Sequence, residues 1–367
     1  MRIGINCRSF LKEKYTGIGR YAYHLVKSLV QADTKNNYSL YANINFFDFK
    51  RKAPAVKAKN FSVKIDRFDR GPKKTIGAVD VYHLPSPELS MDFGVKTVVT
   101  VHDLVYKTYP EGHPDGAREI SEKQLAATAK NADRIICVSQ STKDDFKRFF
   151  SVDERKLSVI YHGVDENIFS PLREGESARA SWVVRSLGIQ KPFLLFVGTI
   201  EPRKNLKNLL EAFSLLKKRG SFGGVLVVAG MKGWMVEGLE ALTAKLGIIQ
   251  EVIFLGWVED EGLRYMYALA EIFIYPSFYE GFGFPILEAF HCGAAVVTSD
   301  VSSCPEIAKD AALLVDPRDP QKIAGAIEKI LGDKNLKKTL KEKALSRAKD
   351  FSFLKTARET LGVYQAA

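Results

Sequence analysis

The stretch FLLFVGTIEPRKNLKNLLEAF, residues 193–213, shows the structural unit from which the chain is built. Residues 193–197 are all apolar and predict a buried strand. After Asn205 the apolar side chains recur at the spacing of a helix face: Leu206, Leu209, Leu210 and Phe213. A wholly apolar strand followed by an amphipathic helix is typical of a parallel sheet that helices cover on both faces.

The same alternation continues along the chain in two series. The predicted strands of the first series are 2–6, 38–42, 79–83, 96–101, 134–138 and 157–161, and those of the second are 193–197, 224–229, 251–255, 272–275, 295–298 and 312–315. Two such series predict an α/β protein with two doubly wound, parallel-sheet (Rossmann-like) domains. The polar stretch 163–191 predicts their boundary, and residues 46–76 are expected to form a loop-rich basic insert.

The positive charge of the chain is concentrated at its beginning. The formal net charge is +11, whereas residues 1–74 alone hold 17 Lys or Arg against 5 Asp or Glu. Such a surface is compatible with nucleic acid, with an anionic membrane or with simple solvation. No known nucleic-acid-binding module is recognisable, and we therefore predict no nucleic-acid partner.

Other features of the composition indicate a cytoplasmic protein. There is no run of about 18 apolar residues, so no membrane-spanning helix is expected. The first residues, MRIGINCRSF, are typical of a strand and not of a signal peptide. The four cysteines are scattered, which argues against a disulfide framework and against a structural zinc site: Cys7, Cys137, Cys292 and Cys304.

A pair of glutamates marks the first candidate site, in FYEGFGFPILEAFHCG, residues 278–293. The segment follows a predicted strand, and Pro285 suits the first turn of a helix. The glycines permit backbone N–H groups to converge, and a helix N-terminus attracts anions. Glu280 and Glu288 suit hydroxyl groups on either side of such an anion, as in a sugar nucleotide. The alternative is a helix with one acid near its start and a Glu288–His291 pair.

Two cations mark the second candidate site. Arg203 and Lys204 precede the helix that begins near Asn205. The N-terminus of a helix disfavours cations, so helix stability does not explain these two side chains, and their removal is expected to cost little stability. A bound diphosphate would explain them. The alternative is two solvated basic residues.

Two further candidates lie in the first half of the chain. Gly17 and Gly19 belong to YTGIGRYAYHL, residues 15–25, which predicts a glycine loop that approaches a ligand, or a plain helix-entry turn. His102 follows the predicted strand 96–101, at the end of the sheet where open parallel sheets bind ligands. A structural histidine is the alternative there.

Taken together, these motifs resemble glycosyltransferase family 4. Glu280 and Glu288, with seven residues between them, match the E-x7-E motif of retaining glycosyltransferases. The segments TGIGRY, VHD, VSQST, VIYHGVD, VGTIEPRKN, FLGWV, PSFYEGFGFPILEAFHCG and PEI occur in the order of the family and cover nearly the whole chain. The resemblance implies a GT-B fold, in which two Rossmann-like domains face each other across a cleft. Residues 1–170 would form the acceptor-side domain, joined by the C-terminal helix 351–367, and residues 171–350 the domain that binds the nucleotide sugar.

The resemblance also implies roles for single residues. Arg203 and Lys204 would bind the diphosphate of the donor, and Glu288 its ribose. Glu280 would hold the transferred sugar together with the main chain of Gly281, Phe282, Gly283 and Phe284. The base would contact the main chain near Trp257 and Val258.

In the first domain, the resemblance places Gly17 and Gly19 near the donor and His102 beside the sugar and the acceptor. The departing phosphate oxygen would help to take the proton of the acceptor. No cofactor and no metal are implied, in keeping with the absence of a D-x-D sequence.

The expected activity is that of a retaining, metal-independent hexosyltransferase. The spelling GTIEPRKNL is similar to that of bacterial mannosyltransferases of surface polysaccharide assembly, which favours mannose from GDP-mannose as donor and a polysaccharide or lipid-linked sugar as acceptor. A glucosyltransferase that uses UDP- or ADP-glucose and a sugar-nucleotide epimerase on the same fold remain open. A basic nucleic-acid-binding protein is a third class that the charge permits, but no known module supports it. Attachment to the inner face of an anionic membrane is one reading of the basic N-terminal residues.

Overall fold

The computed structural model describes residues 1–11, 17–47, 51–52, 54–89, 93–112, 115–234 and 238–367. The chain divides into two compact units, each built on its own parallel sheet. Unit 1 comprises Met1–Tyr106, His113–Gly163 and Ser352–Ala367, and unit 2 comprises Lys107–Gly112 and Val164–Phe351. The predicted domain limits, 170/171 and 350/351, lie seven residues and one residue from these junctions.

The sheet of unit 1 has the strand order β3-β2-β1-β4-β5-β6-β7, and all of its pairings are parallel. Its strands are β1 (Arg2–Asn6), β2 (Asn37–Asn43), β3 (Phe61–Asp66), β4 (Val81–Leu84), β5 (Lys96–Val101), β6 (Arg134–Cys137) and β7 (Leu157–Val159). Its helices are α1 (Gly17–Ala32), α2 (Pro72–Ile76), α3 (Val105–Thr108, which runs into unit 2), α4 (Asp115–Asn131), α5 (Gln140–Phe149) and α14 (Phe353–Ala366).

The sheet of unit 2 has the order β10-β9-β8-β11-β12-β13 and is also parallel throughout. Its strands are β8 (Phe193–Val197), β9 (Val225–Ala229), β10 (Val252–Gly256), β11 (Ile272–Tyr275), β12 (Val296–Ser299) and β13 (Leu313–Val315). Its helices are α6 (Ser177–Ser186), α7 (Leu206–Lys218), α8 (Leu239–Leu246), α9 (Asp260–Leu269), α10 (Phe284–His291), α11 (Cys304–Ala308), α12 (Pro320–Gly332) and α13 (Lys334–Ala348).

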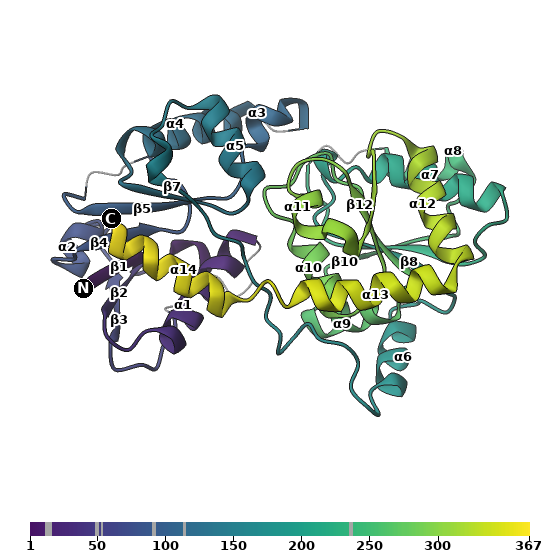
Figure 1. Cartoon of the computed structure of the whole chain (residues 1–367), viewed down its shortest axis with the longest axis horizontal. Helices are drawn as coiled ribbons and strands as arrows, with labels where there is room; N and C mark the ends of the chain where they lie inside the picture. The colour runs from purple at the N-terminus through teal and green to yellow at the C-terminus, as the bar shows by residue number, and fades with distance from the viewer. Residues whose placement is uncertain (12–16, 48–50, 53, 90–92, 113–114, 235–237) are drawn as a thin grey trace. The chain divides into compact units, whose positions relative to one another are not determined.

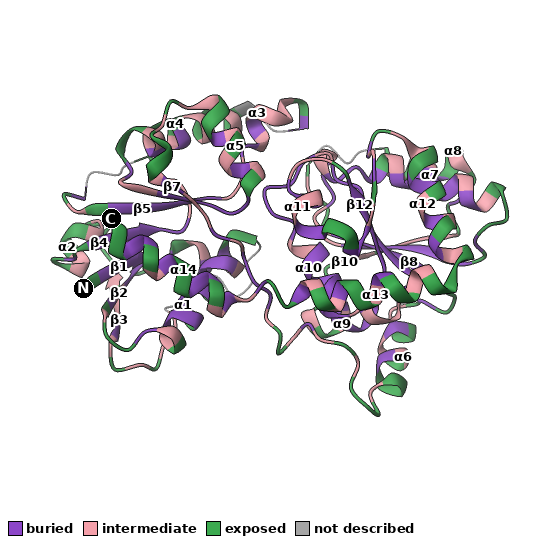
Figure 2. Cartoon of the chain, in the orientation of Figure 1, coloured by how far each residue is buried: buried purple, intermediate pink, exposed green. Residues whose placement is uncertain are grey.

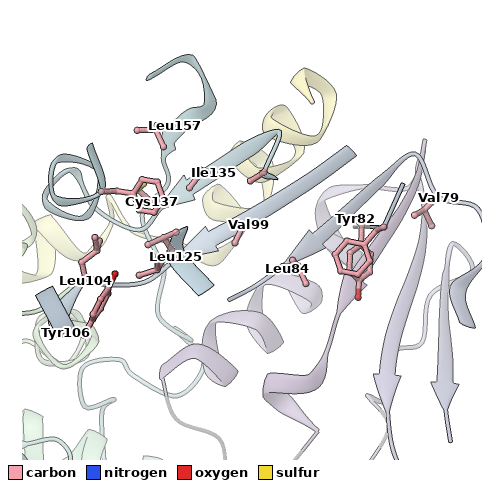
Figure 3. Close-up of a cluster of buried hydrophobic side chains, with 14 residues drawn as sticks. Val79, Tyr82, Leu84, Val99, Leu104, Tyr106, Leu125, Ile135, Cys137 and Leu157 are labelled. Atoms are coloured by element: carbon pink, nitrogen blue, oxygen red, sulfur yellow. The ribbon is translucent and has the colours of Figure 1, made fainter. Parts of the chain in front are cut away.

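The apolar runs of the sequence became the strands of both sheets. All twelve predicted strands are present, with ends that differ by at most two residues, and most of their residues are buried (Figure 2). Wholly apolar strands need cover on both faces, and the helices supply it. In unit 1 the side chains between one face and its helices form a continuous core, which includes Tyr82, Val99 and Ile135 (Figure 3).

The expectation of a loop-rich insert at residues 46–76 was wrong. This segment contains the strand β3, which pairs in register with β2, and the short helix α2. Because β3 lies at the edge of the sheet, it is paired on one side and half exposed, and its sequence FSVKID tolerates Lys64 facing solvent. The sequence of β3 lacks a continuous apolar run because the strand lies at the edge of the sheet and is half exposed.

The C-terminal helix α14 returns to unit 1 and packs along α1 (Figure 1). The imidazole Nδ1 of His83 lies 2.7 Å from the hydroxyl oxygen of Tyr364, and the hydroxyl of Thr356 donates to the carbonyl of Tyr161 at 2.7 Å. Burial lowers the pKa of His83 to about 3, so this contact is made by a neutral ring. No helix among the described residues is both long and apolar enough to cross a membrane.

Gly163 sets how closely the start of α14 can approach the rest of unit 1. A Cβ atom at this position would lie 2.1 Å from the backbone nitrogen of Phe353 and 2.4 Å from the carbonyl carbon of Ser352. We expect Gly163→Ala to lower the free energy of unfolding by about 1–3 kcal/mol, because backbone atoms must move to admit the methyl group. Urea unfolding followed by circular dichroism measures this.

The control for Gly163→Ala is Gly362→Ala, within α14. A Cβ there has nothing within 4 Å, so the better helix propensity of alanine should leave stability unchanged or raise it by up to about 1 kcal/mol. Equal unfolding curves for the two variants would show that the approach at Gly163 is not tight.

Candidate active site

The candidate site of unit 2 forms where three neighbouring strands end. The loops that follow β8, β11 and β12 carry Arg203 and Lys204, Glu280, and Ser302 and Ser303 respectively. These strands are adjacent in the sheet and parallel, so their carboxyl ends lie at the same edge. That edge is where open parallel sheets bind ligands.

Glu280 connects the two cations. The Nζ atom of Lys204 donates to Oε1 of Glu280 at 2.6 Å, and Nη1 of Arg203 donates to Oε2 at 2.7 Å. Arg203 also contacts the carboxylate of Glu201, with 2.6 Å between Nε and Oε1. The hydroxyl of Tyr275 accepts a hydrogen bond from Lys204. The structure thus assembles two cations and two carboxylates into one cluster.

This cluster is largely withdrawn from water. The side chains of Lys204 and Glu280 are 8% and 7% exposed, whereas that of Arg203 is 20% exposed. Burial alone would raise the pKa of Glu280, but the charges of Arg203 and Lys204 outweigh it and hold this pKa at about 2. The pairing of Glu280 therefore stabilises the fold fully above its ordinary pKa of 4.5, and this stabilisation is lost as the pH falls towards 2. Burial lowers the pKa of Lys204, and its two carboxylate neighbours oppose that shift.

Both cations precede the helix instead of standing in its first turn. They belong to a 3-10 turn, Pro202–Lys204, and α7 begins at Leu206. Asn205 lies between this turn and α7 and has a positive φ of 60°. Its side-chain amide donates to the carbonyls of Pro276 and Pro317. This anchor holds the backbone directly after Lys204. The solvated alternative is wrong, because Lys204 is buried and both cations are paired with carboxylates. In contrast to the expectation from the sequence, the buried pair leads us to predict that removal of Lys204 costs stability.

The glycine loop of residues 281–283 is held by two serines. The hydroxyl of Ser302 accepts from the backbone nitrogen of Glu280 at 3.0 Å. The hydroxyl of Ser303 contacts the carbonyls of Glu280 and Phe282 at 3.0 and 2.9 Å. Gly283 has a φ of 104°, a conformation that glycine adopts most readily, and α10 follows from Phe284. Gly281 lies in the same loop, and both Gly281 and Phe282 are buried.

Glu288 has a different environment from Glu280. It lies on α10, is 4% exposed, and accepts a hydrogen bond from the hydroxyl of Tyr267 on α9 at 2.9 Å. The two glutamates therefore hold different partners in the structure, although the sequence presents them as one motif. Trp257 and Val258, expected near the nucleotide base, directly follow β10.

The remaining candidates lie in unit 1. Gly17 and Gly19 occupy the first turn of α1, and a Cβ at Gly17 would meet nothing within 4 Å. His102 follows β5; its Nε2 donates to the carbonyl of Pro85 at 2.7 Å, and its ring lies 5.1 Å from that of Tyr21. Burial lowers the pKa of His102, which leaves the ring neutral near pH 7. A neutral ring fixed through Nε2 presents Nδ1 as its acceptor.

Within the described residues, no group of three or more His, Cys, Asp or Glu side chains is arranged to hold a metal ion. The four cysteines are buried and form no disulfide: Cys7, Cys137, Cys292 and Cys304. The side chain of Ser139 caps α5 by accepting a hydrogen bond from the backbone nitrogen of Thr142.

Sequence reasoning missed several residues that shape the site: Glu201, Tyr267, Tyr275, Ser302 and Ser303. Tyr275 and Ser302 had a usable signal, because both lie at or just after the carboxyl end of a predicted strand. Glu201 stands two residues before Arg203, and the diphosphate interpretation of the segment needs only the two cations. The partner of Glu288 comes from another helix, so no local pattern points to it.

Comparison with known proteins identifies the class. The family model "Glycosyl transferases group 1" matches residues 184–347, and "Glycosyltransferase Family 4" matches residues 49–168. Several solved structures cover the whole chain at low identity and show the fold alone. Sucrose-phosphate synthase from Thermosynechococcus elongatus matches at a TM-score of 0.78 and 20% identity, with 98% of that chain covered. WaaG, a glycosyltransferase involved in lipopolysaccharide biosynthesis, matches at 0.72 and 16%, with 100% of that chain covered.

Curated relatives narrow the class to a family. The O-antigen chain mannosyltransferase B of Escherichia coli is 31% identical over 97% of this chain and 97% of its own length. The serotype-specific mannosyltransferase WbdA of E. coli is 31% identical over 71% of this chain but only 32% of its own length. The chain belongs to glycosyltransferase family 4, and it is a glycosyltransferase with the GT-B fold. The family, the fold and the enzyme class inferred from the motifs are confirmed.

The ion pair between Lys204 and Glu280 can be tested through stability. We expect Lys204→Met to lower the free energy of unfolding by about 3–5 kcal/mol, because it leaves the buried carboxylate without its nearest cation. Lys207→Met, at an exposed position on α7, is the matched control and should change little. Combining Lys204→Met with Glu280→Gln should cost less than the sum of the two single changes, since both remove the same pair. Strict additivity in denaturant titrations would contradict the pairing.

Proposed function

We propose that the protein is a retaining hexosyltransferase that transfers mannose from GDP-mannose to a polysaccharide or lipid-linked sugar acceptor. The observation that carries the proposal is the buried cluster of Arg203, Lys204 and Glu280 at the carboxyl edge of the second sheet. It offers two cations for a diphosphate and a carboxylate for sugar hydroxyl groups in one place. The names of two similar proteins, both mannosyltransferases, support mannose as the transferred sugar.

In the proposed reaction, the bond between the anomeric carbon of the sugar and the diphosphate oxygen breaks. A bond from the acceptor hydroxyl oxygen to the same carbon forms, and the proton of that hydroxyl passes to the departing phosphate oxygen. Arg203 and Lys204 stabilise the negative charge that develops on this oxygen. The greater exposure of Arg203 makes it the cation that an entering diphosphate would meet first, while Lys204 stays paired with Glu280.

The other assignments follow the same division. Glu280, together with the main chain of Gly281, Phe282, Gly283 and Phe284, would hold the transferred sugar, and Glu288 the ribose. The main chain near Val258 would contact the base. In unit 1, Gly17 and Gly19 would approach the donor, and His102, neutral and fixed by Pro85, would face the sugar or the acceptor. We propose a cytoplasmic site of action, where nucleotide sugars are made available to such enzymes.

The transfer should not require a divalent metal, since the sequence has no D-x-D and places cations where a metal would otherwise neutralise the diphosphate. Purified protein incubated with labelled GDP-mannose and an extract of cell lipids and glycans should form a labelled product in excess EDTA. UDP-glucose and ADP-glucose, tested in parallel, should transfer more slowly. Activity that disappears with EDTA and returns with Mg²⁺ would contradict metal independence, and conversion of the donor sugar without acceptor would indicate an epimerase.

The two glutamates should respond differently to removal of their charge. Glu288→Gln should weaken binding of free GDP, because the proposed contact with the ribose is lost. Glu280→Gln should leave GDP binding undiminished and reduce transfer, because Glu280 would contact the sugar alone and its loss releases Arg203 and Lys204 for the diphosphate. Isothermal titration calorimetry with GDP, alongside transfer rates, separates the two. Equal losses of GDP affinity would contradict the division of roles.

A further inference from the structure

Three exposed phenylalanines lie beside the edge strand of unit 1. Phe46 and Phe47 follow β2, Phe68 follows β3, and their exposed fractions are 51%, 86% and 68%. β2 and β3 are neighbouring parallel strands, so both segments leave the same end of the sheet. The rings of Phe46 and Phe68 are in contact, edge to face, with 5.3 Å between centroids. Large apolar side chains gathered in water mark an interaction surface.

Arginines lie over two of these rings. The guanidinium carbon of Arg67 is 5.1 Å from the centroid of Phe46, and that of Arg70 is 5.8 Å from the centroid of Phe68. Both arginines are exposed. The surrounding sequence, residues 44–74, holds ten Lys or Arg against three Asp. We call the surface formed by Phe46, Phe47, Arg67, Phe68 and Arg70 the aromatic–basic surface.

The turn that carries Arg67, Phe68 and Arg70 is fixed by its own acids. Asp66 is fully buried and accepts hydrogen bonds from the backbone nitrogens of Phe68, Arg70 and Gly71, at 3.2, 3.1 and 2.8 Å. The hydroxyl of Tyr41 donates to it at 2.9 Å. These bonds hold the pKa of Asp66 below its ordinary value although burial opposes this, so the carboxylate stays charged.

Asp69 is engaged in the same way. It has a positive φ of 53° and accepts from the side-chain amide of Asn43 at 2.7 Å, which ties the turn after β3 to the end of β2. Asp66 thus holds the backbone of the turn, and Asp69 anchors the turn to the end of β2. The exposed side of the turn carries phenylalanine and arginine side chains. The hydrogen bonds within the chain fix the conformation of the turn without a bound partner.

We propose that the aromatic–basic surface docks the protein on an anionic lipid bilayer, with the phenylalanines entering the headgroup region and the arginines binding lipid phosphates. Charge complementarity selects this occupant: the basic side chains match an anionic surface, and apolar rings between them match the boundary of the acyl chains. A soluble polyanion without aromatic bases would account for the arginines but gives no reason for three exposed phenylalanines. The docking is independent of which sugar the enzyme transfers.

Vesicle binding tests the proposal without any enzymatic readout. The wild-type chain should sediment with vesicles that contain phosphatidylglycerol and not with vesicles of phosphatidylcholine alone. Arg67→Gln combined with Arg70→Gln should weaken binding by roughly 20-fold at 0.1 M salt, since each basic residue near an anionic surface contributes about a factor of five. At 1 M salt, where the Debye length falls to about 3 Å, this difference should largely vanish.

The phenylalanines provide the decisive variant. Phe47→Ser combined with Phe68→Ser should weaken binding at least fivefold at 0.1 M salt, although it changes no charge. The matched controls are Trp182→Ser, an aromatic residue 69% exposed on α6, and Lys218→Gln combined with Lys349→Gln, both exposed in unit 2. All variants should keep the unfolding midpoint and GDP affinity of the wild type, because none touches the core or the candidate site.

Two outcomes would overturn the proposal. The first is absence of binding to anionic vesicles at low salt, or binding that the phenylalanine variant retains in full. The second concerns single-stranded RNA, on which aromatic side chains can stack. If Phe47→Ser with Phe68→Ser abolishes binding of a fluorescent oligonucleotide while vesicle binding persists, the surface serves nucleic acid and not lipid.

Discussion

The pairing of Glu280 with Lys204 and Arg203 is the constraint on which the candidate site depends. A carboxylate in this buried position is tolerated because two cations lie within 2.7 Å of its oxygens. The same contacts fix where the cations point. The cluster therefore contains its own charge balance, and removing one member is expected to lower the stability of the fold. Tyr275 accepts a hydrogen bond from Lys204, and Glu201 pairs with Arg203, so both cations have a second partner.

The parallel sheet explains why such distant residues meet. Lys204 and Glu280 are separated by 76 positions in sequence, yet both follow strands that are neighbours in the sheet. Ser302 and Ser303 come from the next strand and hold the backbone of the glycine loop. The loop after β11 is hydrogen-bonded to the loops after β8 and β12, so the geometry of the site follows from the strand order and not from any single motif.

Unit 1 applies the same architecture to different residues. Its strands end near His102, which is neutral and held by a carbonyl, and near the exposed phenylalanines beyond β2 and β3. Two acids of this unit fix the turn after β3: Asp66 accepts from backbone nitrogens and Asp69 from the side-chain amide of Asn43. The arginines beside them remain on the surface. The basic residues that are evident in the sequence are therefore held in defined positions by the edge strand β3, which sequence analysis missed.

The sequence by itself determined the class of fold, twelve strands, the family and the residue types of the candidate site, because apolar periodicity and short motifs are local properties. It did not reveal β3, whose pattern is that of a half-exposed edge strand, since burial depends on neighbours that the sequence does not show. The sequence also placed Lys204 at a helix N-terminus, where a cation does not stabilise the helix. Only the tertiary structure decided that Lys204 and Glu280 form a buried pair and that Glu288 is held by Tyr267, because each partner comes from a different segment of the chain.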